Sequence, residues 1–234
     1  MNFLLSIDDT DSPDSRGTGR LARAIADILG REYPVSGVTR HQLFVHESIP
    51  YTSHNSCAVI HIGSCSQNQE ERIFFLACDM MKRNFIEGSD PGIAIAGIEA
   101  VTPAVVTFGL DAKRIVLNQE RARTLARNCS IRLEGLGGTE EGVIGAMAGL
   151  GLAATGYDGR FIQKGRIREI RGPVPAETLL SSGIDLILTL DGVPIRKGMI
   201  LVRDGKSVKP CPVAGKAVLF VEEREGNFHA VKRD

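Results

Sequence analysis

Residues 1–31 have the sequence MNFLLSIDDTDSPDSRGTGRLARAIADILGR. The apolar run over 2–7 predicts a buried strand, and three carboxylates, those of Asp8, Asp9 and Asp11, follow it directly. Apolar residues at helical spacing then predict a helix over 19–31. This succession of strand, acidic turn, glycine loop and helix determines both the fold and the chemistry expected of the chain.

The acidic turn is suited to holding a metal ion. Carboxylates crowded together repel one another, and without a cation the pKa of one of them rises. Magnesium prefers oxygen ligands and is usually shared between protein carboxylates and substrate phosphates. We therefore predict that Asp8, Asp9 and Asp11 are catalytic residues that hold Mg²⁺ or orient the attacking group.

The glycine loop that follows is suited to binding phosphate. It lies where the predicted helix begins, so free backbone N–H groups and the positive end of the helix dipole would meet an anion there. Glycines let the main chain approach such an anion closely. Metal and loop together favour phosphoryl transfer from ATP, and the predicted ATP-binding residues are Thr10, Gly17, Thr18, Gly19 and Arg20.

The same residues permit other interpretations. Asp and Ser are common caps and turn formers, so 11–17 is also compatible with a solvated loop. The spacing of Asp9, Asp11 and Asp14 resembles a calcium-binding loop, but Pro13 and the lack of an entering helix argue against one. A metal-dependent phosphatase would use Asp9 as its nucleophile and Asp11 as its acid. A nucleotide- or RNA-binding module without chemistry is a further alternative.

Composition limits the partners. The chain of 234 residues has 28 Lys and Arg against 28 Asp and Glu, and this formal neutrality argues against a large nucleic-acid partner. Its five cysteines form no CxxC pair, which argues against structural zinc. No secretory signal and no long apolar run are visible, so we expect a cytoplasmic protein with reduced thiols and no membrane partner.

Periodicity predicts an α+β protein in two parts. The second part, after residue 184, alternates apolar and polar residues around DG, DG and EGN turns, which predicts a β-meander or small barrel. We place the boundary near 130, with a domain carrying the acidic site over 1–130 and a β-rich domain over 131–234. The other expected elements are strands 35–45, 57–63, 93–98 and 131–134, and helices 67–85, 119–128 and 143–152.

Three pairs of residues are candidate substrate contacts. His54 and Asn55 lie in the polar loop between two predicted strands. Gly138 and Thr139 lie in a glycine-rich stretch that could form a second anion-binding loop. Asp158 and Arg160 follow the next helix and could bind a charged substrate group. Each pair also has a structural alternative. His54 and Asn55 could be hydrogen-bonded strand residues, Gly138 and Thr139 could serve close helix packing, and Asp158 and Arg160 could form a surface ion pair.

The segment IDDTDSP at 7–13 resembles the opening of the archaeal tRNA-isoleucine agmatinylcytidine synthetases. IPYTSHNSCAVI at 49–60 is similar to a segment of that family's kinase-like domain, and GGTEEGVIGAMAGLG at 137–151 to its ferredoxin-like domain. The resemblance implies a kinase-like domain followed by a ferredoxin-like one. It also implies an enzyme that phosphorylates the wobble cytidine of a tRNA from ATP and then replaces the activated group with agmatine.

The resemblance is partial. Family members continue through an OB-fold and a zinc ribbon that grip the tRNA, and we expect neither here. Thr52, His54 and Asn55 stand where the family has basic residues, and GYDGRFIQ stands in place of its agmatine segment. The expected function is therefore an ATP- and Mg²⁺-dependent phosphotransferase or ligase. Its partners would be a nucleotide and an acceptor, either a small molecule or RNA. We expect no DNA partner, and a second copy of the chain is a candidate partner.

Overall fold

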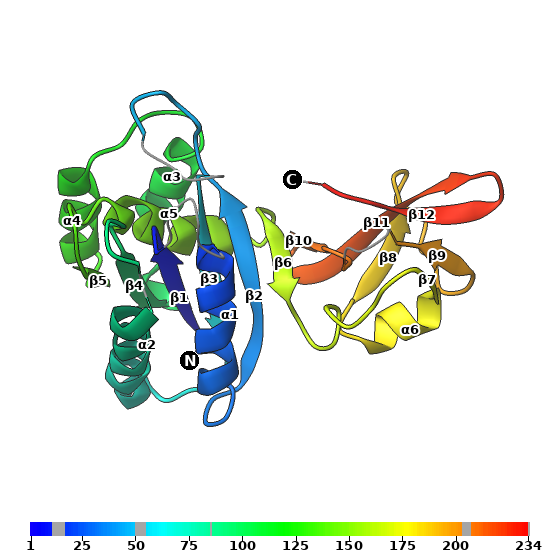
Figure 1. Ribbon diagram of the computed structural model, residues 1–234, viewed down its shortest axis with the longest axis horizontal. Coiled ribbons are helices and arrows are strands. Elements are labelled where there is room, and N and C mark those ends of the chain that lie inside the picture. The colour runs from blue at the N-terminus through cyan, green and yellow to red at the C-terminus, as the bar shows by residue number, and fades with distance from the viewer. Residues whose placement is uncertain (11–16, 50–54, 85, 203–206, 234) are drawn as a thin grey trace. The chain divides into compact units, whose positions relative to one another are not determined.

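The structure is a computed structural model that describes residues 1–10, 17–49, 55–84, 86–202 and 207–233. It divides into two compact units, unit 1 over Met1–Thr155 and unit 2 over Gly156–Asp234 (Figure 1). The expected α+β class is confirmed, since both units combine helices with largely antiparallel sheets. The expected boundary near residue 130 falls inside unit 1, because the strand and helix that follow it pack with the first sheet.

Unit 1 is built on five strands that pair in the order β5-β4-β1-β3-β2. Each neighbouring pair is antiparallel, so β1, β2 and β5 all run in the same direction. The strands are β1 (Phe3–Asp8), β2 (Val35–Gln42), β3 (Ser56–Ile62), β4 (Gly92–Gly97) and β5 (Arg132–Gly135).

Helices cover both faces of this sheet (Figure 1). Two of them, α1 (Thr18–Leu29) and α2 (Glu70–Asn84), pack on one face, with a 3-10 turn at Gln67–Gln69 leading into α2. On the opposite face, Leu4, Val59 and Ala94 form a core with three other helices. These are α3 (Pro103–Asp111), α4 (Gln119–Asn128) and α5 (Gly142–Ala154).

Strand β1 is buried on both faces, as its continuous apolar run predicts. Side chains alternate along a strand, so Leu4, Ser6 and Asp8 point toward α5. Helix α5 is apolar all round, which is typical of a fully buried helix. It approaches β1 so closely that a Cβ placed on Gly149 would lie 2.2 Å from the Ser6 Oγ.

Most elements expected in unit 1 are confirmed within a few residues, and α4 begins and ends where its pattern predicts. Helix α3 was not expected, because Pro103 interrupts an apolar run. Pro103 in fact occupies the first turn of α3, where a missing N–H costs no hydrogen bond. A short 3-10 turn at Ile98–Ala100 precedes it.

Unit 2 is a β-rich module around a second core, which includes Ile187, Ile200 and Leu219. Its strands pair in the order β10-β11-β12-β9-β7, with β8 also on β11. The elements are β6 (Arg160–Gln163), β7 (Pro173–Pro175), α6 (Ala176–Ser181), β8 (Leu186–Thr189), β9 (Met199–Leu201), β10 (Cys211–Val213), β11 (Lys216–Arg224) and β12 (Asn227–Val231).

The meander expected after residue 184 is only partly correct. The hairpin of β11 and β12 forms as predicted, around Glu225 and Gly226 at φ 50° and 77°. However, β8 pairs with β11 in parallel, and β9 pairs with β12 in parallel. Alternation alone predicts strands but not partners, so this mixed topology could not be derived from it. No helix among the described residues is long and apolar enough to cross a membrane.

The contact of α5 with β1 yields a test of packing. Alanine normally stabilises a helix interior relative to glycine by about 1 kcal/mol. At Gly149 the added Cβ would collide with the Ser6 Oγ at 2.2 Å and meet the Cys57 Sγ at 3.0 Å. We therefore expect Gly149→Ala to lower the free energy of unfolding by about 1–3 kcal/mol, measured by urea denaturation.

Two further variants control this experiment. Gly63→Ala places a Cβ at an ordinary 3.5 Å from its nearest neighbour and should change stability little. Ser6→Ala in the Gly149→Ala background removes the nearest colliding atom and should recover part of the loss. An increase in stability for Gly149→Ala alone would show that α5 does not press on β1 in this way.

Candidate active site

Several chain segments meet at one edge of the unit 1 sheet. Strands β1 and β2 end there and β4 begins there, since Asp8 pairs with Gly92. Because β1 and β5 run in the same direction, the helices that follow them, α1 and α5, both begin at this edge. The electropositive ends of two helices therefore flank the end of β1 from opposite faces of the sheet.

Asp8 is the last residue of β1 and is 9% exposed. Its carboxylate lies against the beginning of α5, because a Cβ on Gly145 would fall 1.7 Å from the Asp8 Oδ2. Any side chain at position 145 would therefore displace this carboxylate. Asp8 thus lies at the end of β1, against the first turns of α5.

Asp9 turns the chain out of the strand. Its φ of 49° is in the left-handed region, which Asp and Asn tolerate better than most residues, and it is half-buried. Asp11, the third predicted carboxylate, lies outside the described residues.

Two threonines join the end of β1 to the start of α1. The hydroxyl of Thr18 accepts hydrogen bonds from the backbone N–H of Thr10 at 3.4 Å and from its hydroxyl at 3.2 Å. Both threonines are buried, and their contact links the residue after the acidic strand end to the first residue of the helix. The two predicted ATP-binding threonines thus bind each other in the structure.

The remaining predicted phosphate-binding residues form the first turn of α1. Gly17 is the N-cap, with φ 82°, and has no side chain to occupy the helix end. Its carbonyl accepts a hydrogen bond from the Arg20 N–H at 2.9 Å. Gly19 is half-buried, and the Arg20 side chain is exposed. The N-cap of α1 therefore has no side-chain cap, and it follows the acidic turn in the chain.

The glycine-rich loop before α5 reaches the same edge, but several of its amides are already bonded. The Thr139 N–H donates to the Asp90 Oδ1, and the Gly142 N–H donates to the Asp90 carbonyl at 2.8 Å. Gly138 has φ 59° and packs against Asp90. Asp90 therefore fixes this loop, a role that the GSDPG turn did not indicate in the sequence.

Asn55 closes the connection between β2 and β3. Its side-chain Nδ2 donates to the Phe44 carbonyl at 2.7 Å, and its own carbonyl accepts from the Leu43 N–H at 2.9 Å. Its observed role is therefore to shape the loop at the active-site edge. His54 lies outside the described residues.

Asp158 and Arg160 belong to unit 2. Arg160 begins β6 and is 8% exposed, and Asp158 precedes it in the turn after Gly156. This predicted pair is therefore carried by a different unit from Asp8.

A polar chain lies beside the acidic end of β1 on the α5 face. The Thr39 hydroxyl hydrogen-bonds the Nε2 atoms of His41 and His61, each at 2.8 Å. His41 pairs with Cys57, which stands between β1 and β2 at the level of Asp8. His41 and His61 are therefore hydrogen-bonded strand residues.

The donor chemistry of the edge fits a magnesium ion. Carboxylates and hydroxyls are hard oxygen ligands, and Mg²⁺ commonly uses only one or two protein carboxylates together with phosphate and water. Among the described residues, no three His, Cys, Asp or Glu side chains gather into a metal site. The fit therefore depends on Asp8, Asp9 and a substrate phosphate.

Buried thiols are not nucleophiles here. Cys57, Cys65 and Cys78 are buried, and burial, aided by the nearby Glu134 charge, raises the pKa of Cys78 to about 12. Burial also raises the pKa of Cys211. These shifts keep Cys78 and Cys211 protonated at neutral pH.

Neither a protein-family model nor a curated protein sequence matches the chain. A layered fold of this kind is found among solved enzyme structures. Two of them are TiaS, an agmatidine synthetase for an isoleucine tRNA, without ligand (TM-score 0.55, 21% identity) and with that tRNA and ATP (TM-score 0.56, 22% identity). A third is TiaS with the tRNA, AMPCPP and agmatine (TM-score 0.55, 21% identity).

These matches cover 64% of this chain, a share close to that of unit 1. They cover only 35–36% of the TiaS chains, so this chain spans about a third of those proteins. At such low identity the likeness shows a TiaS-like fold. It agrees with the fold that the sequence motifs imply.

The threonine contact can be tested by removing the shared acceptor. Thr18→Val keeps the side-chain shape but leaves the Thr10 N–H and hydroxyl without their observed partner. We expect a loss of about 1–3 kcal/mol in the free energy of unfolding. Thr18→Ser keeps the hydroxyl and should retain most of the stability in the same denaturation experiment.

The raised pKa of Cys78 predicts slow alkylation. At pH 8, well below about 12, almost none of this thiol is the reactive thiolate. Iodoacetamide should therefore label Cys78 slowly in the folded protein and quickly in urea, as measured by peptide mass spectrometry. Equally fast labelling in both states would contradict the burial of Cys78.

Proposed function

We propose that this protein is an ATP- and Mg²⁺-dependent phosphoryl-transfer or ligase-type enzyme that modifies a nucleotide of an RNA acceptor. The observation that carries the proposal is the position of Asp8 and Asp9 at the end of β1, ahead of the glycine-opened start of α1. The TiaS-like fold supports it, since TiaS has been solved with tRNA together with ATP or AMPCPP.

In this proposal, different residues of the chain bind phosphate and orient the attacking group. The start of α1, with the positive end of its helix dipole, binds phosphate oxygens, and the Arg20 guanidinium neutralises their charge as a fork of donors. Asp8, held against Gly145, orients the attacking group. Most of the catalysis then comes from positioning and charge neutralisation, as is general for phosphoryl transfer.

Magnesium would be held by Asp8, Asp9 and Asp11. When bound, it neutralises charge on the polyphosphate. The loop residues Asn55, Gly138 and Thr139 shape the acceptor end of the same edge, and we assign His54 to it as well. Asp158 and Arg160, in unit 2, would by themselves bind a charged group.

The proposal is tested by Asp9→Asn. Asparagine also tolerates the left-handed φ of 49°, so the backbone should be kept while a metal ligand is lost. We expect ATP turnover to disappear while the thermal unfolding midpoint stays unchanged or rises, because a repelling charge is removed. Turnover is measured as ADP release in the presence of Mg²⁺ and RNA.

Asp191→Asn is the matched control, because Asp191 is an exposed carboxylate in unit 2. It should leave turnover unchanged. Normal turnover in Asp9→Asn would refute the proposed metal site. Phosphate release without ATP, together with trapping by beryllofluoride, would instead indicate a phosphatase with Asp9 as its nucleophile.

A further inference from the structure

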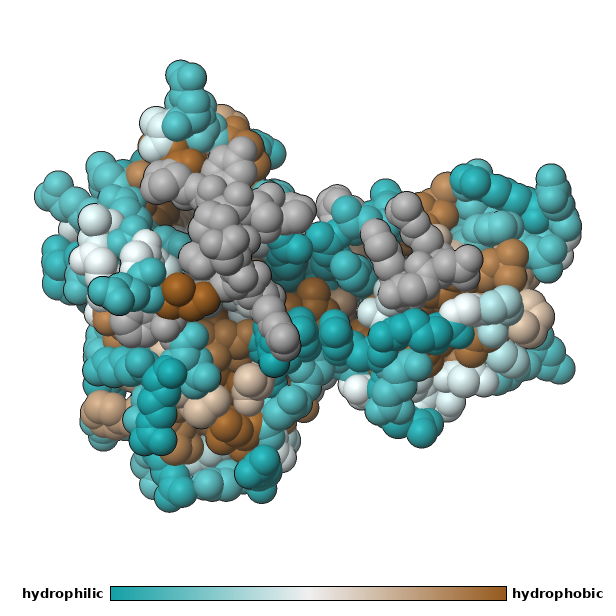
Figure 2. All heavy atoms as spheres, viewed as in Figure 1, coloured by the Kyte–Doolittle hydropathy of each residue, from teal (hydrophilic) through white to brown (hydrophobic). Residues whose placement is uncertain are grey.

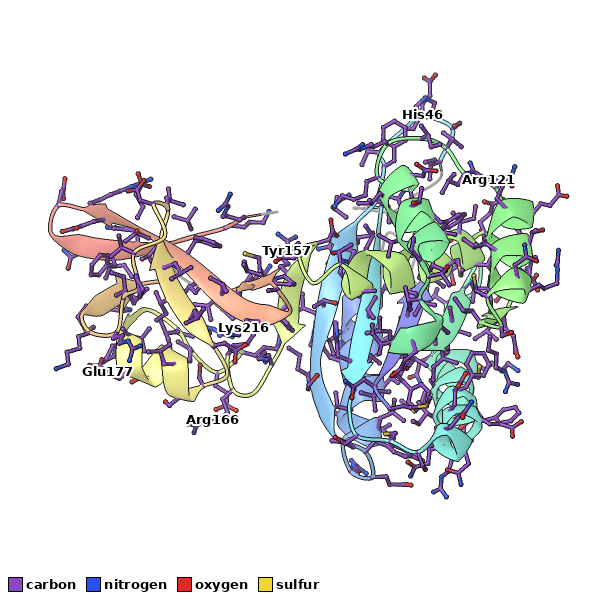
Figure 3. All side chains as sticks on the ribbon, turned by 180° about the vertical axis from the view of Figure 1, so that it is seen from behind. His46, Arg121, Tyr157, Arg166, Glu177 and Lys216 are labelled. Atoms are coloured by element: carbon purple, nitrogen blue, oxygen red, sulfur yellow. The ribbon has the colours of Figure 1, made fainter. Side chains whose placement is uncertain are left out.

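The segment after β2 carries a stacked pair of rings, Phe44 and His46. Their centroids are 5.6 Å apart and their planes are inclined by 26°. His46 is exposed and Phe44 is half-buried. Figure 3 shows His46 at the tip of this segment, beyond α3. One flat ring is thus supported from below by another and faces solvent.

Hydrogen bonds fix the orientation of the His46 ring. The Ser48 N–H donates to the His46 Nδ1 at 3.2 Å, and the Ser48 Oγ lies 2.8 Å from the same nitrogen. Since a backbone N–H can only donate, Nδ1 is the acceptor and the ring proton is on Nε2. A ring held in this way loses little freedom when something stacks on it.

The backbone beneath the rings is also fixed. The Phe44 N–H donates to the Ala112 carbonyl at 2.9 Å, at the end of α3. The Phe44 carbonyl accepts from Asn55 Nδ2 at 2.7 Å, at the start of β3. Two elements therefore hold this pair of rings, which we call the Phe44–His46 platform.

Exposed apolar side chains occur in the two segments that the Phe44–Ala112 hydrogen bond joins, those after β2 and after α3. Figure 2 shows hydrophobic residues among hydrophilic ones on the surface of unit 1. Val45 is 52% exposed, Ile115 46% and Val116 47%. Isolated exposed apolar residues are ordinary, but these accompany two stacked rings. The patch therefore offers a flat, apolar surface to a ligand.

Positive charge accompanies this patch. Residues 111–127 contain five Lys and Arg against two acids, whereas unit 1 as a whole has 14 against 18. Arg121, on α4 (Figure 3), pairs with Asp111 at 3.4 Å. Arg114 is exposed and forms no ion pair among the described residues. Arg123 also pairs with Glu140, so the exposed Arg114 and Arg127 carry the positive charge that this segment offers to a polyanion.

We infer that the Phe44–His46 platform stacks an unpaired nucleobase of single-stranded RNA whose phosphates are neutralised by the basic segment over 111–127. Stacking on flat rings beside cations is how proteins bind unpaired bases. The inference rests on the proposed function, because the platform follows β2, whose end lies two strands from the end of β1 at the same edge of the sheet.

The experiment measures binding of the full chain to a fluorescein-labelled single-stranded RNA decamer by anisotropy. His46→Ala should weaken binding about 5- to 100-fold, the range for losing one stacked base. His46→Phe restores a flat ring and should recover most of the affinity. His229→Ala, which alters a half-buried histidine on β12 in unit 2, is the matched control and should bind like the wild type.

Two further measurements separate charge from stacking. Arg114→Gln removes one contact to phosphate, so the slope of log affinity against log salt should become shallower by about 1. Stacking of the unpaired base on His46 should be retained. An RNA duplex of the same length should compete poorly, because its bases are not available for stacking.

The outcomes are decisive. Wild-type protein that does not bind the decamer, or His46→Ala that binds it equally well, would overturn the inference. A thermal shift with ATP and Mg²⁺ tests the proposed function separately. If RNA binding depends on His46 while ATP gives no shift, the platform stands and the phosphoryl-transfer proposal fails. Loss of RNA binding with a normal ATP shift in His46→Ala supports both.

Discussion

The close approach of α5 to β1 is the constraint on which the rest of unit 1 depends. It exists because glycine stands at positions 145 and 149, above Asp8 and Ser6 respectively. A larger residue at either position would move a buried helix away from a buried strand, and cores packed at crystal-like density relax such changes poorly. The two glycines therefore serve as contact surfaces rather than as flexible joints.

This contact also sets the electrostatics of the active-site edge. With α5 held against β1, the Asp8 carboxylate lies beside one helix start, and α1 begins on the other face of the sheet. The fold thus places a carboxylate between the starts of two helices, and the positive ends of helix dipoles favour an anion such as a phosphate.

Sequence alone predicts those features whose cause is local. Apolar spacing predicts β1, α1 and α4, and the EGN turn predicts the hairpin of β11 and β12. Contacts between distant segments could not be predicted. Nothing near Gly145 indicates that it meets Asp8, and nothing near β8 indicates a parallel partner in β11. The platform was missed because stacking depends on the loop conformation that Asn55 and Ala112 impose.

The neutral total charge of the chain is a poor guide to its partners, because the charge is distributed unevenly. Unit 2 holds 14 of the 28 basic residues but only 10 of the 28 acidic ones, and unit 1 has the reverse imbalance. Within unit 1 four of the 18 acids fall in residues 8–14, while 111–127 is basic. At physiological salt, charges interact over about 8 Å, so a polyanion responds to such local clusters and not to a sum over 234 residues. An argument against RNA from net charge therefore fails for a protein whose acidic and basic clusters occupy separate segments of one unit.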